Sequence, residues 1–69
     1  MKLGWEDGHE ITISSNGEAT RILANREGMI SLAHILTDLA EQKPGTHAHL
    51  DEYNSLMHGT HEIIIERAD

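Results

Sequence analysis

A single stretch of this chain has a helical repeat, and it divides the remaining residues into two halves. From Asn25 to Glu41, apolar residues recur every three or four positions, which predicts a helix with one apolar stripe. The stripe consists of Met29, Leu32, Ala33, Leu36, Leu39 and Ala40, and the opposite side carries Ser31, His34, Thr37, Asp38 and Glu41. Asn25 is suited to cap the helix, and Lys43-Pro44-Gly45 to end it. Because glycine costs about 1 kcal/mol relative to alanine inside a helix, Gly28 indicates a close approach of backbone there.

Two stretches with alternating polarity precede the helix. Residues 9–14 place Ile11 and Ile13 on one face, and Asn16-Gly17 follows as a strong hairpin signal. Residues 18–24 then return as a second strand. Neither face of that strand is cleanly polar, so we expect it to be central in its sheet.

The first eight residues end in a turn signal, Glu6-Asp7-Gly8. Leu3 and Trp5 alternate with polar neighbours, which is compatible with a short first strand or an ordered arm. Because Trp5 lies near a terminus, we expect it to pack against the core rather than to bind a partner.

Two further strands follow the helix, at residues 46–51 and 61–66, joined by a polar loop over residues 52–60. The order ββαββ predicts an α+β fold in which one helix packs on one face of a four-stranded mixed sheet, in two layers. A right-handed crossover would make the second and third strands parallel. The length of 69 residues predicts a single domain, 1–69.

One helix covers only one face of such a sheet. The open face would carry His47, His49 and Ile64, with some of Arg21 and Leu23 or of Thr20 and Ile22. Such a surface is polar enough for solubility yet apolar enough to be covered by a partner. A chain this short also has a thin margin of stability. Both points favour a homodimer, or another partner, on the open face or at a sheet edge.

The chain is strongly acidic, with twelve acidic residues against five basic ones and a formal net charge of −7. Such a charge repels phosphate backbones, so we expect no nucleic-acid partner, and a basic protein is the better expectation. Simple solubility is the alternative reading. No apolar run approaches the roughly 20 residues of a membrane span, and the N-terminus lacks the apolar region of a signal peptide. With no cysteine in the chain, these features predict a cytoplasmic protein that needs no disulfide.

Histidines supply the weak candidates for a metal site. His47 and His49 share a strand face with Asp51, and His61 lies on the neighbouring strand. An ordinary polar strand surface explains the same spacing, so we expect neither metal nor cofactor. Enzymatic activity is not expected either, because neither Ser55 with His58 nor Ser31 with His34 has an orienting carboxylate or an oxyanion donor.

The loop after the third strand contains the candidate binding residues. Tyr53 and Leu56 are large side chains that need cover, which either a partner or the edge of the core must supply. Tyr53 is suited to anchor an interface or to plug the core. The predicted partner-binding set is Asp51, Glu52, Tyr53, Asn54, Leu56 and Glu62.

The run from His47 to Leu56, His-Ala-His-Leu-Asp-Glu-Tyr-Asn-Ser-Leu, followed by Gly59 and by Glu62-Ile63-Ile64-Ile65-Glu66, resembles the immunity protein 32 family of bacterial polymorphic toxin systems. The segment Ala24 to Met29 is similar to that family's entry into its helix. Matching positions are His49, Leu50, Asp51, Glu52, Tyr53, Asn54, Leu56 and Glu62, whereas Met57-His58 departs from the acidic or proline-containing residues expected there. The resemblance implies a small α+β protein that neutralises a cognate toxin, without catalysis.

Two rival hypotheses remain from the sequence. One is a small metal-binding module built on His47, His49 and His61, and the other is a domain that only dimerises. The favoured hypothesis is direct inhibition of a basic toxin, possibly a nuclease, through the loop that carries Tyr53.

Overall fold

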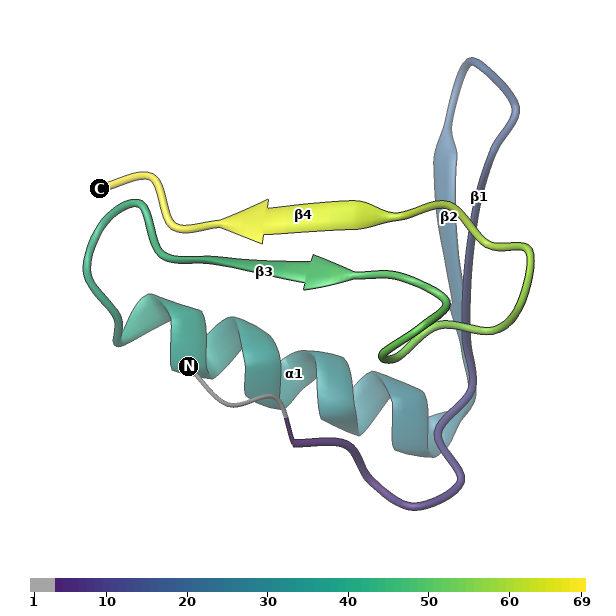
Figure 1. Cartoon of the computed structure of the whole chain (residues 1–69), viewed down its shortest axis with the longest axis horizontal. Coiled ribbons are helices and arrows are strands. Elements are labelled where there is room, and N and C mark those ends of the chain that lie inside the picture. The colour runs from purple at the N-terminus through teal and green to yellow at the C-terminus, as the bar shows by residue number, and fades with distance from the viewer. Residues whose placement is uncertain (1–3) are drawn as a thin grey trace.

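A computed structural model describes residues 4–69 of the chain (Figure 1). The elements, in order, are β1 (Ile11–Ser15), β2 (Thr20–Ala24), α1 (Arg26–Ala40), β3 (His47–Leu50) and β4 (Ile63–Glu66). This order confirms the predicted α+β class and the ββαββ sequence of elements. Within the described residues, no helix is long and apolar enough to cross a membrane.

The predicted four-stranded mixed sheet is wrong. Within residues 4–69, the strands form two separate antiparallel pairs, β1 with β2 and β3 with β4, and β2 and β3 are not parallel neighbours. In Figure 1 the two hairpins run in nearly perpendicular directions, and α1 lies along β3 and β4. The helix therefore runs beside the β3–β4 hairpin, whereas the β1–β2 hairpin projects from the N-terminal end of α1.

The loop before β4 explains why the sheets do not merge. The amide of Met57 donates to the Ile11 carbonyl at 2.8 Å, and the amide of His61 donates to the Ile13 carbonyl at 3.1 Å. Between them, the Thr60 hydroxyl accepts from the Ile13 amide at 2.6 Å and donates to the Ile13 carbonyl at 2.9 Å. Because the Thr60 side chain, rather than the backbone of another strand, bonds to Ile13, the backbone groups on this edge of β1 have partners without a continuous ladder of strand hydrogen bonds.

The prediction that the second strand is central is also wrong. The loop occupies one edge of β1, so β1 has a neighbour on each side, whereas β2 pairs with β1 alone among the described residues. Ile22 lies opposite Ile13 in the register, yet Ile22 and its neighbour Leu23 are both exposed. The mixed polarity of β2 is therefore that of an exposed edge strand rather than of a buried central strand.

The N-terminus of α1 begins as predicted. The Asn25 side chain accepts from the Gly28 amide at 2.8 Å and from the Glu10 amide at 3.0 Å, so one cap also fixes the entry to β1. A Cβ at Gly28 would lie 2.8 Å from the Glu10 carbonyl oxygen and 2.9 Å from Cγ1 of Ile11. This confirms the close approach that the glycine indicated.

The helix is rotated relative to the predicted stripe. Its buried residues are Gly28, Ser31, Leu32, Ile35 and Leu39, whereas Met29, Ala33, Leu36 and Ala40 are exposed. Ser31, which we expected on the polar side, is fully buried. Its hydroxyl accepts a hydrogen bond from the Glu6 amide at 2.9 Å and donates one to the Glu27 carbonyl at 2.8 Å, so the buried hydroxyl has partners within the protein. The N-terminal segment thus covers a flank of the helix that the sequence pattern assigned to solvent.

That N-terminal segment is an ordered arm over residues 4–10, with no strand in this range, and the part of the prediction that falls on residues 1–3 lies outside the described residues. Trp5 is partly buried against the core, in agreement with a packing role. The core consists of Ile11, Ile13, Leu32, Ile35, Leu39, Ala48, Leu50 and Leu56.

Candidate functional site

The loop after β3 is a compact turn built around Asp51. Its carbonyl accepts hydrogen bonds from the amides of Asn54 at 3.3 Å, Ser55 at 3.1 Å and Leu56 at 2.9 Å. Its carboxylate accepts from the amide of Tyr53 at 3.0 Å, which is an Asx turn. Asp51 therefore fixes the backbone of the residues that follow it.

Asn54 and Leu56 hold the same turn in place. The Asn54 side chain accepts from the Asp51 amide at 3.2 Å, donates to the His49 carbonyl at 2.9 Å and also bonds the Ser55 hydroxyl. The side chain of Leu56 is only 6% exposed and belongs to the core. Two members of the predicted binding set thus serve to shape and anchor the loop.

Glu52 closes the second half of the loop. Its carboxylate accepts from the amide of Gly59 at 2.8 Å and lies 3.4 Å from Nδ1 of His58. Gly59 has a φ of +83°, a left-handed conformation that favours glycine at this return. Glu52 remains partly exposed, so one carboxylate both shapes the loop and contributes negative charge to its surface.

Tyr53 lies at the tip of this turn and is 89% exposed, the most exposed of the large apolar side chains described. The backbone on both sides of it is hydrogen bonded, because Asp51 holds its amide and the amide of Asn54. The loop therefore presents an aromatic ring to solvent from a fixed backbone. Of the two roles considered for Tyr53, the plug over the core is excluded by this exposure.

Glu62, the last residue of the predicted set, directly precedes β4 and is exposed. Its carboxylate lies 3.4 Å from Nδ1 of His49, which is opposite Ile64 in the strand register. The rings of His47 and His49 meet edge to face with centroids 5.0 Å apart. His47, His49 and Ile64 are all exposed, as expected, but the second-strand residues predicted to share their face lie in the other sheet, so the predicted continuous open face is wrong.

The candidate metal ligands do not form a cluster. Within residues 4–69, no three histidine, aspartate, glutamate or cysteine side chains lie together in a way that would hold a metal ion. The structure brings His47 to His49 but adds no third ligand, and His61 is fixed to β1 through its amide. The Ser31 hydroxyl donates its proton to the Glu27 carbonyl rather than to His34, so the structure does not pair these two residues as nucleophile and base.

His9 makes contacts that the sequence did not predict. Its ring stacks on Trp5 with centroids 4.8 Å apart, and Nε2 lies 3.0 Å from the Ser55 carbonyl while Nδ1 lies 3.1 Å from the Glu6 carbonyl. The ring thereby links the N-terminal arm to the loop that carries Tyr53. No local pattern around His9 predicts this contact, because Ser55 is 46 positions away.

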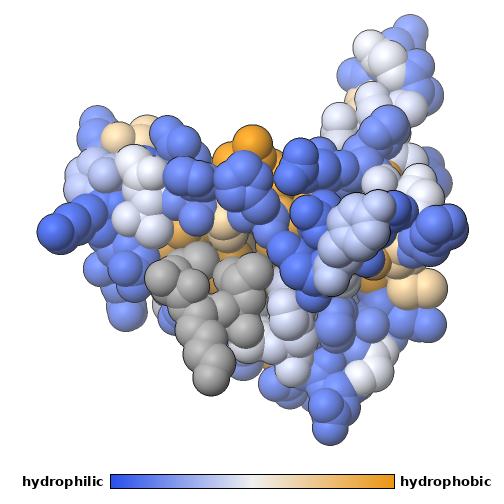
Figure 2. Space-filling model, in the orientation of Figure 1, coloured by the Kyte–Doolittle hydropathy of each residue, from blue (hydrophilic) through white to orange (hydrophobic). Residues whose placement is uncertain are grey.

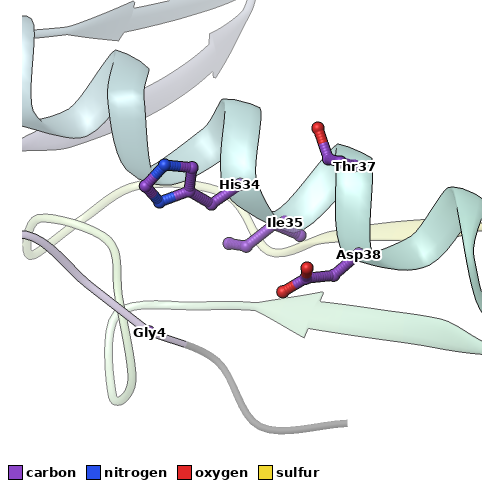
Figure 3. Close-up of a pocket in the computed structure, with 5 residues that line it drawn as sticks. All are labelled: Gly4, His34, Ile35, Thr37 and Asp38. Carbon is purple, nitrogen blue, oxygen red and sulfur yellow. The ribbon is translucent and has the colours of Figure 1, made fainter.

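A surface depression of about 350 Å³ lies between the arm and α1 (Figure 3). It is lined by Gly4, His34, Ile35, Thr37 and Asp38. None of the predicted site residues lines it, and its side chains include no nucleophile framed by a base. The surface seen in Figure 2 is mostly hydrophilic, with the β1–β2 hairpin projecting from the body.

Together these observations describe a small α+β protein whose distinguishing feature is a fixed, acidic loop with an exposed tyrosine. The family model of Immunity protein 32 matches residues 19–68, which is well over half of the chain and includes the whole loop. The chain therefore belongs to the immunity protein 32 family. No curated protein and no solved structure matched the chain significantly. Immunity proteins are generally non-catalytic, and the family implies a cognate toxin as partner and toxin neutralisation as the role.

Proposed function

We propose that this protein neutralises its toxin by direct binding through the loop at residues 51–60, with Tyr53 as the buried anchor of the complex. The protein would act in the cytoplasm against a toxin of a polymorphic toxin system, and would contribute no catalysis, metal or cofactor of its own. The single observation that carries this proposal is the exposure of Tyr53 on a loop whose backbone is held by hydrogen bonds to Asp51 and to β1.

A rigid loop lowers the cost of binding. Tyrosine supplies a large amphipathic contact with few rotatable bonds, and aromatic anchors of this kind dominate the binding energy of many interfaces. Because Asp51 and Asn54 already fix the backbone around Tyr53, little conformational entropy remains to be lost on association. We therefore assign Asp51, Asn54 and Leu56 to the shape of the binding loop, and Tyr53, Glu52 and Glu62 to contact with the toxin.

The charge of the protein indicates what the toxin surface is like. A formal net charge of −7 on 69 residues accelerates encounter with a basic surface. Glu52 and Glu62 place part of this charge near Tyr53 in the sequence and at the surface. A basic toxin fits this surface, and nuclease activity is the best match because sites that bind a phosphate backbone are positively charged.

Co-expression with the toxin encoded beside this gene tests the proposal. The wild-type protein should protect the cell, Tyr53→Ala should lose protection, and Tyr53→Phe should keep most of it because the ring remains. Leu23→Ala is the matched control, since Leu23 is another exposed large side chain but lies on β2. Asp51→Ala should weaken protection through the shape of the loop.

Full protection by both Tyr53→Ala and Asp51→Ala would exclude the loop as the binding element. Protection lost equally in Leu23→Ala would place the contact on the first hairpin instead. Elemental analysis of protein purified without an affinity tag checks the rival metal-binding module, which requires stoichiometric metal.

We propose a second copy of the chain as the other partner, on the open face of β3 and β4 or at a sheet edge. The supporting observations are the exposed His47, His49 and Ile64 on that face and the edge of β2 that no strand covers within the described residues. A homodimer is compatible with toxin binding, because these residues are distinct from the loop that carries Tyr53.

A further inference from the structure

The loop that carries Tyr53 is attached to the core, to β1 and to the N-terminal arm. Leu56 attaches it to the core, where this side chain is only 6% exposed. The amide of Met57 donates to a carbonyl of β1 at 2.8 Å. On the arm, Nε2 of His9 lies 3.0 Å from the carbonyl oxygen of Ser55. Of these three attachments, the one from the arm reaches the loop nearest to Tyr53 along the chain.

The arm fixes the ring of His9 independently of the loop. The ring stacks on Trp5 with centroids 4.8 Å apart and planes inclined by 17°, and Trp5 packs against the core. A turn closes behind the ring, because the amide of His9 donates to the Glu6 carbonyl at 3.2 Å. The Glu6 amide in turn donates to the buried hydroxyl of Ser31 on α1. The imidazole is therefore held by the helix and the core, and the tautomer with its proton on Nε2 donates to Ser55.

The carbonyl that His9 bonds belongs to a buried residue. Ser55 is 8% exposed, its amide donates to the Asp51 carbonyl at 3.1 Å, and its hydroxyl is bonded to the Asn54 side chain. A buried backbone carbonyl needs a hydrogen-bond partner, and leaving it without one is costly. Without the imidazole, the loop would have to move for this oxygen to reach water or another donor. The hydrogen bond from His9 therefore restricts where Ser55 and the adjoining turn can lie.

We propose that His9 is a positioning residue for toxin binding, which holds the loop in the conformation that presents Tyr53. This inference rests on the function proposed above. His9 acts through Ser55 and needs no contact with the toxin. The arm that carries His9 precedes residues 19–68, the range of the family match. A segment outside the matched range therefore contributes to the shape of the binding loop.

A positioning residue and a contact residue affect the kinetics of binding differently. When the hydrogen bond from His9 is lost, the loop samples more conformations, and only the molecules with the competent loop bind. Association should therefore slow down, whereas dissociation should be unchanged because the complex, once formed, has lost no contact. Loss of the Tyr53 ring should instead speed up dissociation, since a contact itself is removed.

Amide hydrogen exchange of the free protein tests the effect on the loop and needs no toxin. His9→Phe is the main variant, because its ring can still stack on Trp5 but donates no hydrogen bond. The amides of Ser55 and Leu56, which both donate to the Asp51 carbonyl, should exchange at least about fivefold faster. Amides of the β3–β4 ladder should keep wild-type rates, because the change is local.

Two further variants separate the hydrogen bond from the rest of the side chain. His9→Gln retains an N–H donor near the position of Nε2, so it should return the exchange rates of the loop close to those of wild type. His34→Ala is the matched control, because it removes an exposed imidazole from α1 beside the depression that the arm borders. It should leave the loop unchanged. Wild-type exchange rates in His9→Phe, or equal acceleration in His34→Ala, would overturn the proposal.

Binding kinetics on the immobilised toxin encoded beside this gene test the effect on recognition. His9→Phe should lower the association rate constant by about threefold or more and leave the dissociation rate constant within about twofold of wild type. Tyr53→Ala should raise the dissociation rate constant. If Tyr53→Ala binds like wild type, the proposed function fails and the positioning role fails with it. If Tyr53→Ala is defective but His9→Phe associates at the wild-type rate, the positioning role alone is overturned.

Discussion

The two hairpins of this protein differ in how their connecting segments relate to the rest of the fold. β1 and β2 are joined by a short connection over residues 16–19 and project away from the body, and within the described residues no strand covers the outer edge of β2 (Figure 1). β3 and β4 are joined by a long loop that folds back, buries Leu56 and satisfies the other edge of β1. The segment that sequence patterns label as a loop is thus more deeply integrated than one of the strands.

This difference indicates where function can reside. A loop that is anchored at Leu56 and braced by Asp51 and Asn54 can expose Tyr53 without losing its shape. The first hairpin has exposed apolar residues too, Ile22 and Leu23, but they lie on a strand that pairs on one edge only, with β1. The comparison therefore indicates that the β3–β4 hairpin, through its loop, is the region that holds an exposed side chain in a fixed position. Paired substitutions, one in each hairpin, test this difference.

The largest effect is expected from truncating the anchor of the loop. Leu56→Ala should lower the free energy of unfolding by about 2–5 kcal/mol, because it leaves a cavity in the core. Leu23→Ala, at a position 64% exposed on β2, should change it by no more than about 0.5 kcal/mol. Chemical denaturation of both variants measures this pair. Equal losses would mean that the first hairpin is as integrated as the second.

A smaller effect is expected where the base of the first hairpin meets the helix. Gly28→Ala should destabilise the protein by about 1–3 kcal/mol, because the new Cβ would overlap the Glu10 carbonyl and Ile11. The sign is informative, since this substitution ordinarily stabilises a helix by about 1 kcal/mol. Ala33→Gly, at an exposed helix position, provides the control and should cost about 1 kcal/mol. A higher melting temperature for Gly28→Ala would refute the close packing.

A still smaller effect is expected at the contact that separates the two sheets. Thr60→Val keeps the volume but removes the hydroxyl that bridges the amide and carbonyl of Ile13, at a cost of about 1 kcal/mol. Thr20→Val, on exposed β2, should be nearly neutral. Amide hydrogen exchange at Ile13 should rise in the first variant and stay unchanged in the second. Unchanged protection in both would show that Thr60 does not stabilise the edge of β1.

Local patterns predicted a good part of this fold. The order of elements, the Asn25 cap, the crowded Gly28 and the outward-facing His47 and His49 all follow from rules that act within a few residues. The α+β class follows from the same order. These features depend little on how distant segments meet.

The errors have a common physical cause, which is side chains that act over long separations in the chain. Thr60 replaces strand backbone beside Ile13, 47 positions away, so the four strands form two sheets. Ser31 is buried because the Glu6 amide reaches it across 25 positions, and this contact rotates the helix relative to its apolar stripe. Neither contact has a signature in the sequence. The predicted binding set stays a prediction, and within it the structure distinguishes the residues that shape the loop, Asp51, Asn54 and Leu56, from the exposed Tyr53.

The most direct test of the central claim measures folding and binding on one variant. Tyr53→Ala should leave the free energy of unfolding within about 0.5 kcal/mol of wild type, because the ring is exposed. Titration calorimetry with the purified toxin should show a loss of about 2 kcal/mol or more in binding free energy, roughly thirtyfold in Kd. A variant that is equally stable and binds the toxin with unchanged affinity would contradict the account.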